Sequence, residues 1–164
     1  MQNKFILDAC CGTRMFWNDK NHSNVLYIDN RIREKGFAID NDKREIKPDI
    51  QMDFRNMNFK DNSFKMVVFD PPHIIRNSEA GVYSRVYGIL SRDTWKEDIG
   101  KGFKECWRVL DDYGTLIFKW SESSIKLKEV LEIINQQPLI KHKGKNTTYW
   151  LCFMKIPKNS KVYI

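Results

Sequence analysis

The sequence lacks any long apolar run. No stretch of the 164 residues approaches the roughly 20 apolar residues that a membrane-spanning helix needs. The opening residues MQNKFILDACCG contain an apolar run too short for a signal peptide, and Asp8 interrupts it. We therefore expect a cytoplasmic chain with no membrane contact.

The sequence also lacks the spacing of a metal site or a disulfide framework. Its four cysteines include no Cys-x-x-Cys pair, and its three histidines are scattered. Neither zinc-ligand spacing nor a secreted disulfide scaffold is present, so we expect reduced thiols and no metal.

Acidic residues are scarce in the last quarter of the chain. Residues 1–122 hold 20 basic and 19 acidic residues, whereas residues 123–164 hold eight lysines and only two glutamates. These counts place +6 of the net charge of +7 in the last 42 residues. A phosphate-bearing partner would explain this excess, and so would lysines that discourage pairing at an exposed sheet edge.

Composition and pattern together indicate one globular α/β domain covering residues 1–164. Hydrophobic residues make up 41% and charged residues 30%, which is typical of a folded domain. The sequence favours a Rossmann-like, doubly wound and mostly parallel seven-stranded sheet with an antiparallel C-terminal hairpin. Strands are predicted at 4–10, 24–29, 49–54, 64–70 and 115–120, helices at 95–110 and after Ser123 or Ser124, a turn at 111–114 with Gly114 supplying backbone freedom, and a hairpin around 144–146.

Acidic residues stand at the ends of the first three predicted strands. Asp8 precedes a turn containing Gly12, and Asp29 follows that glycine by 17 positions, a distance suited to a ribose ligand. Asp53 ends the third strand, where a carboxylate could accept a hydrogen bond from an adenine amine. Each alone could be an ordinary turn residue. In combination they favour a nucleoside pocket at the carboxyl edge of the sheet, although Arg14 stands where a dinucleotide motif would carry another glycine.

DACCGT, YIDN, MDF and VVFDPPH, in this order, resemble the motifs of class I S-adenosylmethionine-dependent methyltransferases. DPPH is similar to the Asp-Pro-Pro-aromatic motif of the amino-methyltransferases that modify exocyclic nitrogens of adenine or cytosine. The chain also resembles compact members carried by phages and prophages. The resemblance implies S-adenosyl-L-methionine as cofactor, with these residues binding it: Asp8, Cys10, Gly12, Thr13, Arg14, Asp29, Asn30, Asp53 and Phe54.

Within the same resemblance, Asp70, Pro71, Pro72 and His73 match the catalytic motif, and His73 replaces the usual aromatic residue. The chemistry suits these residues. The carboxylate of Asp70 and a backbone carbonyl can each accept one N–H of an exocyclic amine, and the prolines stiffen the backbone that presents them. His73 could stack on a flipped base or donate a hydrogen bond.

The segment that follows is long enough for a lid. Tyr83, Arg85, Tyr87 and Arg92 interleave aromatic and cationic side chains, which suits stacking on bases and contact with phosphates, although packing of at least one tyrosine on the core is also expected.

We expect an N-methyltransferase acting on a nucleic-acid base, with adenine N6 in DNA or RNA as the first target. A protein partner or a homo-oligomer would supply sequence specificity, because little chain remains for a target-recognition domain. Two alternatives stay open. One is methylation of a protein side-chain amide or a small metabolite. The other is a degenerate domain that binds nucleic acid or a partner without catalysis, which the arginine at position 14 would favour.

Overall fold

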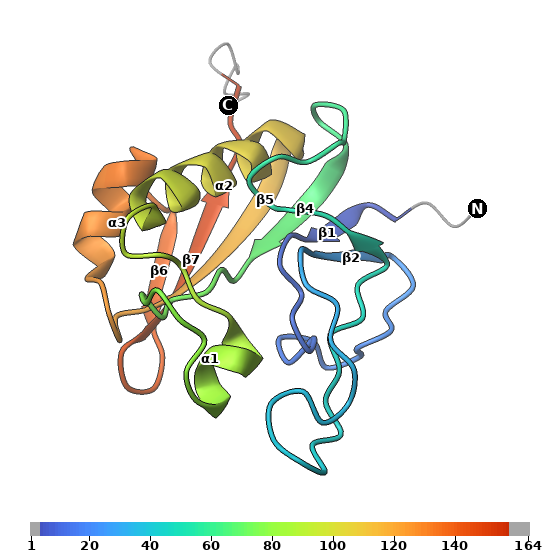
Figure 1. Ribbon diagram of the computed structural model, residues 1–164. Helices are drawn as coiled ribbons and strands as arrows, with labels where there is room; N and C mark the ends of the chain where they lie inside the picture. Colours follow the sequence, from blue (N-terminus) through green and yellow to red (C-terminus); the bar gives the residue numbers. More distant parts are fainter. Residues whose placement is uncertain (1–3, 158–164) are drawn as a thin grey trace.

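The computed structural model describes residues 4–157, so Lys158 and Lys161, counted above in the basic C-terminal quarter, lie outside the described residues. Its elements in chain order are β1 (Ile6–Asp8), β2 (Val25–Asp29), β3 (Ile50–Gln51), β4 (Phe64–Phe69), α1 (Val82–Tyr87), α2 (Trp95–Val109), β5 (Leu110–Ser121), α3 (Leu127–Ile134), β6 (Ile140–Lys143) and β7 (Thr148–Met154) (Figure 1).

The strands form one seven-stranded sheet in the order β3-β2-β1-β4-β5-β7-β6. The pairs among β3, β2, β1, β4 and β5 are parallel, and β7 pairs antiparallel with both β5 and β6. This confirms the predicted fold class. Because Ser121 of β5 lies opposite Thr148 of β7, the β6–β7 turn sits at the carboxyl end of β5, beside the carboxyl ends of β1, β2 and β4.

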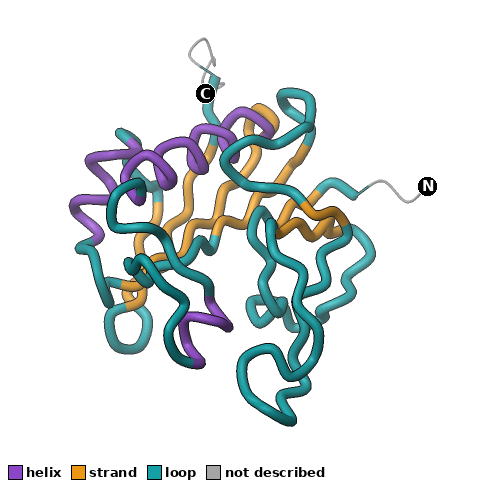
Figure 2. The backbone as a smooth tube through the Cα atoms, viewed as in Figure 1, coloured by secondary structure: helices purple, strands orange, loops and turns teal. Residues whose placement is uncertain are grey.

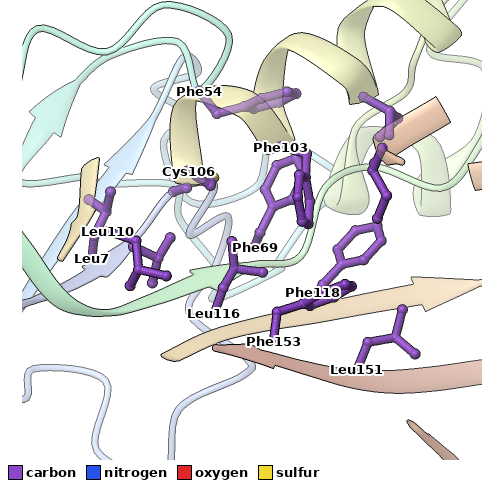
Figure 3. Close-up of a cluster of buried hydrophobic side chains, with 14 of the residues drawn as sticks. Leu7, Phe54, Phe69, Phe103, Cys106, Leu110, Leu116, Phe118, Leu151 and Phe153 are labelled. Carbon is purple, nitrogen blue, oxygen red and sulfur yellow. The ribbon is translucent and has the colours of Figure 1, made fainter. Parts of the chain in front are cut away.

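The core lies between the sheet and helices α2 and α3, which pack together on one face (Figure 1). Alternate strand residues point into it, and Leu7, Val67, Leu116 and Phe153 lie in register across four neighbouring strands and are fully buried or nearly so. Phe69 and Phe118 stack with centroids 5.4 Å apart, among the side chains drawn in Figure 3. Burying each such side chain stabilises the fold by about 1.5–3 kcal/mol.

The opposite face of the sheet is covered differently. Within the described residues, loops rather than helices join β1 to β2, β2 to β3 and β3 to β4 (Figure 2). Trp17 packs with Cys11, Val25 and Tyr27 over one part of this face. Towards the outer strands the face stays open to solvent, and Trp150 and Ile140 are 37% and 63% exposed.

Two local predictions were wrong. Residues 111–114 do not separate α2 from a strand, because β5 begins at Leu110 and bulges there. Leu110 pairs with Phe64, and Thr115 with Met66. Tyr113, with φ of 60°, takes the left-handed conformation that was expected of Gly114. Gly114 is required for space instead, since a Cβ there would lie 2.7 Å from the Asp111 carbonyl oxygen.

The start of α3 was also misplaced. The helix begins at Leu127, whose N–H donates to the carboxylate of Glu122 at 2.9 Å. Neither serine caps it: the hydroxyl of Ser123 donates to the carbonyl of His73, and that of Ser124 accepts from the N–H of Ile75. These serines therefore tie the end of β5 to the loop after Pro72. Among residues 4–157, no helix is long and apolar enough to span a membrane.

Candidate active site

A cavity of about 550 Å³ opens at the carboxyl edge of the sheet. Asp8 and Asp29 end β1 and β2, and Asp70 directly follows β4, so the sheet order brings three carboxylates together. The volume suits a ligand the size of a nucleoside derivative. The predicted residues that line it are Asp8, Cys10, Gly12, Thr13, Asp29, Asn30, Phe54, Asp70, Pro71, Pro72, His73 and Tyr87.

The glycine turn is built onto the end of β2. Gly12 has φ of 48°, a conformation that a side chain would strain, and its N–H donates to Oδ2 of Asp29 at 2.8 Å. The N–H of Cys11 also donates to the carbonyl of Ile28. Asp29 therefore fixes the turn at the same time as it faces the cavity.

Arg14 lies away from the cavity, although it was predicted to bind the cofactor. Its guanidinium stacks on the ring of Tyr27, 3.9 Å from the centroid, and donates to the carbonyl of Lys47 and the carboxylate of Asp49. Its backbone has φ of 54°, the left-handed conformation that a glycine would adopt. Arg14 thus keeps the backbone shape of a glycine turn. Its side chain bridges the β1–β2 loop and the β2–β3 loop, outside the cavity.

Arg31, two positions after Asp29, binds the carboxylate of that aspartate. Arg31 donates through Nε and its backbone N–H to Oδ1 of Asp29, at 3.0 and 2.9 Å. The same guanidinium donates to the carbonyl of Arg85, which connects the end of β2 to α1. The pattern recurs at Asp53 with Arg55.

Asp53 does not itself line the cavity, whereas Phe54 and Arg55 do. Arg55 binds the carboxylate of Asp53 through Nε and also donates to Asp98 of α2 at 2.8 Å. Burial tends to raise the pKa of Asp53, but the hydrogen bonds from Arg55 outweigh it and lower that pKa. Phe54 packs so closely on α2 that a Cβ on Gly102 would lie 2.5 Å from its ring.

Asp70 pairs with a lysine that was not predicted. Nζ of Lys119, on β5, lies 2.7 Å from Oδ2 of Asp70. Burial raises the pKa of Asp70, and the charge and hydrogen bond of Lys119 oppose that rise. Burial also lowers the pKa of His73, which keeps its ring neutral at physiological pH. The sequence feature that could have pointed to Lys119 is its position as a charged residue within the otherwise apolar run TLIFKW.

The lid segment contributes one of its four predicted side chains to the cavity. Tyr87 lines it, with its ring centroid 6.1 Å from that of His73, and stacks with Tyr83, which is 75% exposed. Arg85 donates to the carbonyl of Ala38, and the backbone N–H of Arg92 donates to Asn77. Tyr83, Arg85 and Arg92 are therefore outside the cavity lining.

Two aromatic residues lie on the other side of the cavity: Phe16, which was expected in the core or the pocket wall, and Trp150, which was not predicted. Phe16 and Trp150 both line it, with ring centroids 4.9 Å apart. Trp150 also lies 5.8 Å from Nζ of Lys119. Trp150 and Lys119 are distant in the sequence, and the β5–β7 register brings them together by placing them opposite each other.

Asp8 is the most deeply buried of the cavity carboxylates. Its Oδ2 accepts from Nε1 of Trp17 at 2.7 Å, and its Oδ1 accepts from the N–H of Cys10 at 3.3 Å. Burial is the largest cause that raises the pKa of Asp8 to about 7; the two hydrogen bonds oppose it, and the charges of Asp70 and Asp29 add to it. A ligand cation placed against Asp8 would restore the ionised form.

The raised pKa of Asp8 gives a stability prediction. The folded protein holds this proton more tightly than the unfolded chain, whose pKa is near 3.8, so the contribution to stability is full below pH 4 and is lost towards pH 7. Asp8→Asn does not titrate. Relative to wild type, we expect its free energy of unfolding to rise by up to about 4 kcal/mol between pH 4 and pH 8, measured by urea unfolding. A difference that does not change with pH would contradict the assignment.

The architecture matches solved structures. A methyltransferase from Aquifex aeolicus described as SAM-dependent superposes with a TM-score of 0.51 at 11% identity, over 92% of this chain and 81% of that one. A SAM-dependent methyltransferase from Leishmania major gives 0.52 at 12%, over 90% of this chain and 63% of its own length. The PH0226 protein of Pyrococcus horikoshii gives 0.57 at 14%, over 92% and 81%. The fold is that of SAM-dependent methyltransferases.

The chain spans less than two thirds of the length of the Leishmania protein. No protein-family model and no curated protein sequence matches the chain. At these identities the structural matches establish the fold alone.

Proposed function

We propose that the chain is an S-adenosylmethionine-dependent N-methyltransferase that acts on an exocyclic amine of a nucleic-acid base, with adenine N6 in DNA or RNA as the first target. One observation carries the proposal. Asp70, followed by two prolines, lines the same cavity as Asp8, the Gly12 turn and Asp29. An acceptor for an amine and a set of nucleoside ligands thus share one site on a methyltransferase fold.

The cavity fits the proposed cofactor. Asp8 is buried and suited to its ammonium group, and Phe54 offers an apolar ring for the adenine. Asp29 at the end of β2 suits the two ribose hydroxyls once the Arg31 guanidinium, which donates to both its oxygens, withdraws. Because Gly12 has no side chain, the backbone of its turn can approach the cofactor closely. The cofactor would supply a sulfonium-bound methyl group, which is strongly electrophilic. The amine nitrogen would lose one proton on methylation, and the carboxylate of Asp70 would accept it.

The residues after β4 would then prepare the amine. An exocyclic amine is a weak nucleophile because its lone pair is delocalised into the ring. If Asp70 and the Pro71 carbonyl each accept one N–H, the nitrogen becomes pyramidal and its lone pair points away from both acceptors. Holding two reactants in such an orientation can lower a barrier by roughly 7–11 kcal/mol. Pro71 and Pro72 have no N–H that could compete for these acceptors.

Lys119 lies next to this arrangement. It occupies Oδ2 of Asp70 in the structure, and both side chains remain about one quarter exposed. Its long stem allows the ammonium to shift while still neighbouring the carboxylate. Lys119 therefore acts through Asp70, as a positioning residue that keeps the acceptor ionised until the amine arrives.

The geometry at Arg14 favours a working cofactor site over the degenerate alternative. The arginine adopts the left-handed backbone that a glycine would use, and its side chain leaves the cavity free. The exposed Tyr83–Tyr87 stack beside His73 suits a planar base rather than an aliphatic amide.

Asp29→Ala should weaken binding of S-adenosylmethionine by about 1.5–3 kcal/mol, the value of hydrogen bonds to a charged group. Isothermal titration calorimetry measures it. Asp42→Ala is the matched control, because Asp42 binds Arg44 in the same i, i+2 arrangement but does not line the cavity. Equal affinity of both variants and the wild type would rule out the ribose assignment.

A further inference from the structure

The hairpin formed by β6, β7 and their turn, residues 140–154, lines the cavity through Trp150 but supplies none of the cofactor ligands proposed above. Its turn is at the carboxyl end of β5, where the N–H of Glu122 donates to the carbonyl of Thr147 at 2.9 Å. Asp70, Lys119 and this turn therefore share one edge of the molecule.

An aromatic surface leads from the hairpin into the cavity. Trp150 is 37% exposed, contacts Phe16 and lies on the sheet face opposite α2 and α3. His142, exposed, is its cross-strand neighbour on that face. On the inner side Trp150 neighbours Lys119, which binds Asp70. The surface is therefore continuous with the amine acceptor.

Positive charge gathers at the turn of the hairpin. Residues 133–157 contain no aspartate or glutamate, and Lys143 and Lys145 are exposed at the turn. Lys141 differs, because it lies with Glu122 and Glu132 around a hollow on the α3 side. Lys143 lies on the same strand face as Lys141, with its Nζ 5.8 Å from the ring centroid of Tyr149. Lys143 and Lys145 therefore place positive charge at the turn, on the edge of the sheet that also holds the cavity.

We propose that this hairpin docks a single-stranded polynucleotide whose target base enters the cavity, with Trp150 stacking on a base and Lys143 and Lys145 binding its phosphates. The inference rests on the proposed function and adds the substrate form. Stacking needs unpaired bases, since a duplex hides their faces, and aromatic side chains interleaved with lysines are the usual means of holding such a strand. A second copy of this chain fits poorly, because its net charge of +7 would repel the same lysines.

The test measures fluorescence anisotropy of a labelled 12-nucleotide DNA strand, with the same sequence as RNA and as a duplex in parallel. Trp150→Ala should weaken single-strand binding between about fivefold and a hundredfold, and Trp150→Phe should retain most of it. Lys143→Gln with Lys145→Gln should reduce the slope of log affinity against log salt by about 1.4. Lys101→Gln with Lys128→Gln, on α2 and α3, is the control of equal charge and should change the slope little.

Several results would overturn the docking surface. The proposal is wrong if the wild type binds neither single strand or if it binds the duplex more tightly than the single strands. It is also wrong if Trp150→Ala binds the single strand as tightly as the wild type does. Equal binding of poly-L-glutamate would indicate an acidic protein partner instead. Because Trp150→Ala could disturb packing with Phe16, the double lysine variant gives an independent answer on exposed residues.

Methyl transfer to a free nucleoside separates the two proposals. If the wild type and the double lysine variant methylate a nucleoside equally, but neither hairpin substitution affects strand binding, the docking surface is wrong and the proposed function stands. If strand binding depends on Trp150 and no base is ever methylated, the docking surface stands and the proposed function is wrong.

Discussion

Asp70→Asn is expected to lower kcat by about 10²- to 10⁴-fold, the range that a positioned proton acceptor contributes. The amide has one acceptor oxygen and an NH₂ group that would face the substrate amine donor to donor. Affinity for S-adenosylmethionine should stay within about threefold, because its ligands are Asp8, Asp29 and the Gly12 turn. Steady-state kinetics with calorimetry on the same sample separates the two effects.

Asp111→Asn is the matched control for this substitution. Asp111 also pairs with a lysine across the β4–β5 ladder, Lys65, but outside the cavity lining. A loss of activity in Asp111→Asn as large as in Asp70→Asn would indicate general damage to the sheet. Full methyl transfer by Asp70→Asn would remove the carboxylate from the mechanism.

Lys119→Met is expected to move the acid limb of the pH profile of kcat/KM upwards by about 1–3 pH units. Burial raises the pKa of Asp70, and Lys119 is the main group that opposes this rise. An opposite charge within about 4–6 Å is worth a pKa change of that size. His73 and Asp8 also face Asp70, and both remain in the variant.

The sign of the shift distinguishes this role from a structural one. Without Lys119 the carboxylate stays protonated to higher pH, so the loss of activity should be largest at the acidic end of the profile and should shrink as the pH rises. Lys119→Arg retains the charge and should restore most of the profile, and Lys65→Met, on the same strand pair, should leave it unchanged. A uniform loss at every pH would contradict the positioning role.

The carboxylates at the strand ends could be predicted from sequence because each depends on local features. An apolar run followed by an acidic residue marks the end of a buried strand, and parallel strands bring such ends to one edge. The placement of Asp8, Asp29 and Asp70 around one cavity follows from that rule. The sheet type followed in the same way from the pattern of apolar runs.

The partners of those carboxylates could not be predicted because they depend on register and loop paths. Lys119 lies 49 residues from Asp70, and only the parallel β4–β5 pairing joins them. Trp150 reaches the cavity through the antiparallel register of β7. Arg31 and Arg55 each follow an aspartate by two positions, but this spacing alone does not show that the arginine binds that carboxylate.

The most direct test of the central claim is methyl transfer itself. Wild-type protein is incubated with isotopically labelled S-adenosylmethionine and single-stranded DNA, RNA and duplex DNA, and the digested nucleosides are analysed by mass spectrometry. Label on the exocyclic nitrogen of a base, foremost N6 of adenine, and its absence with Asp70→Asn, is the predicted result. Label on no base, with cofactor binding demonstrated in the same sample, would contradict the proposed function.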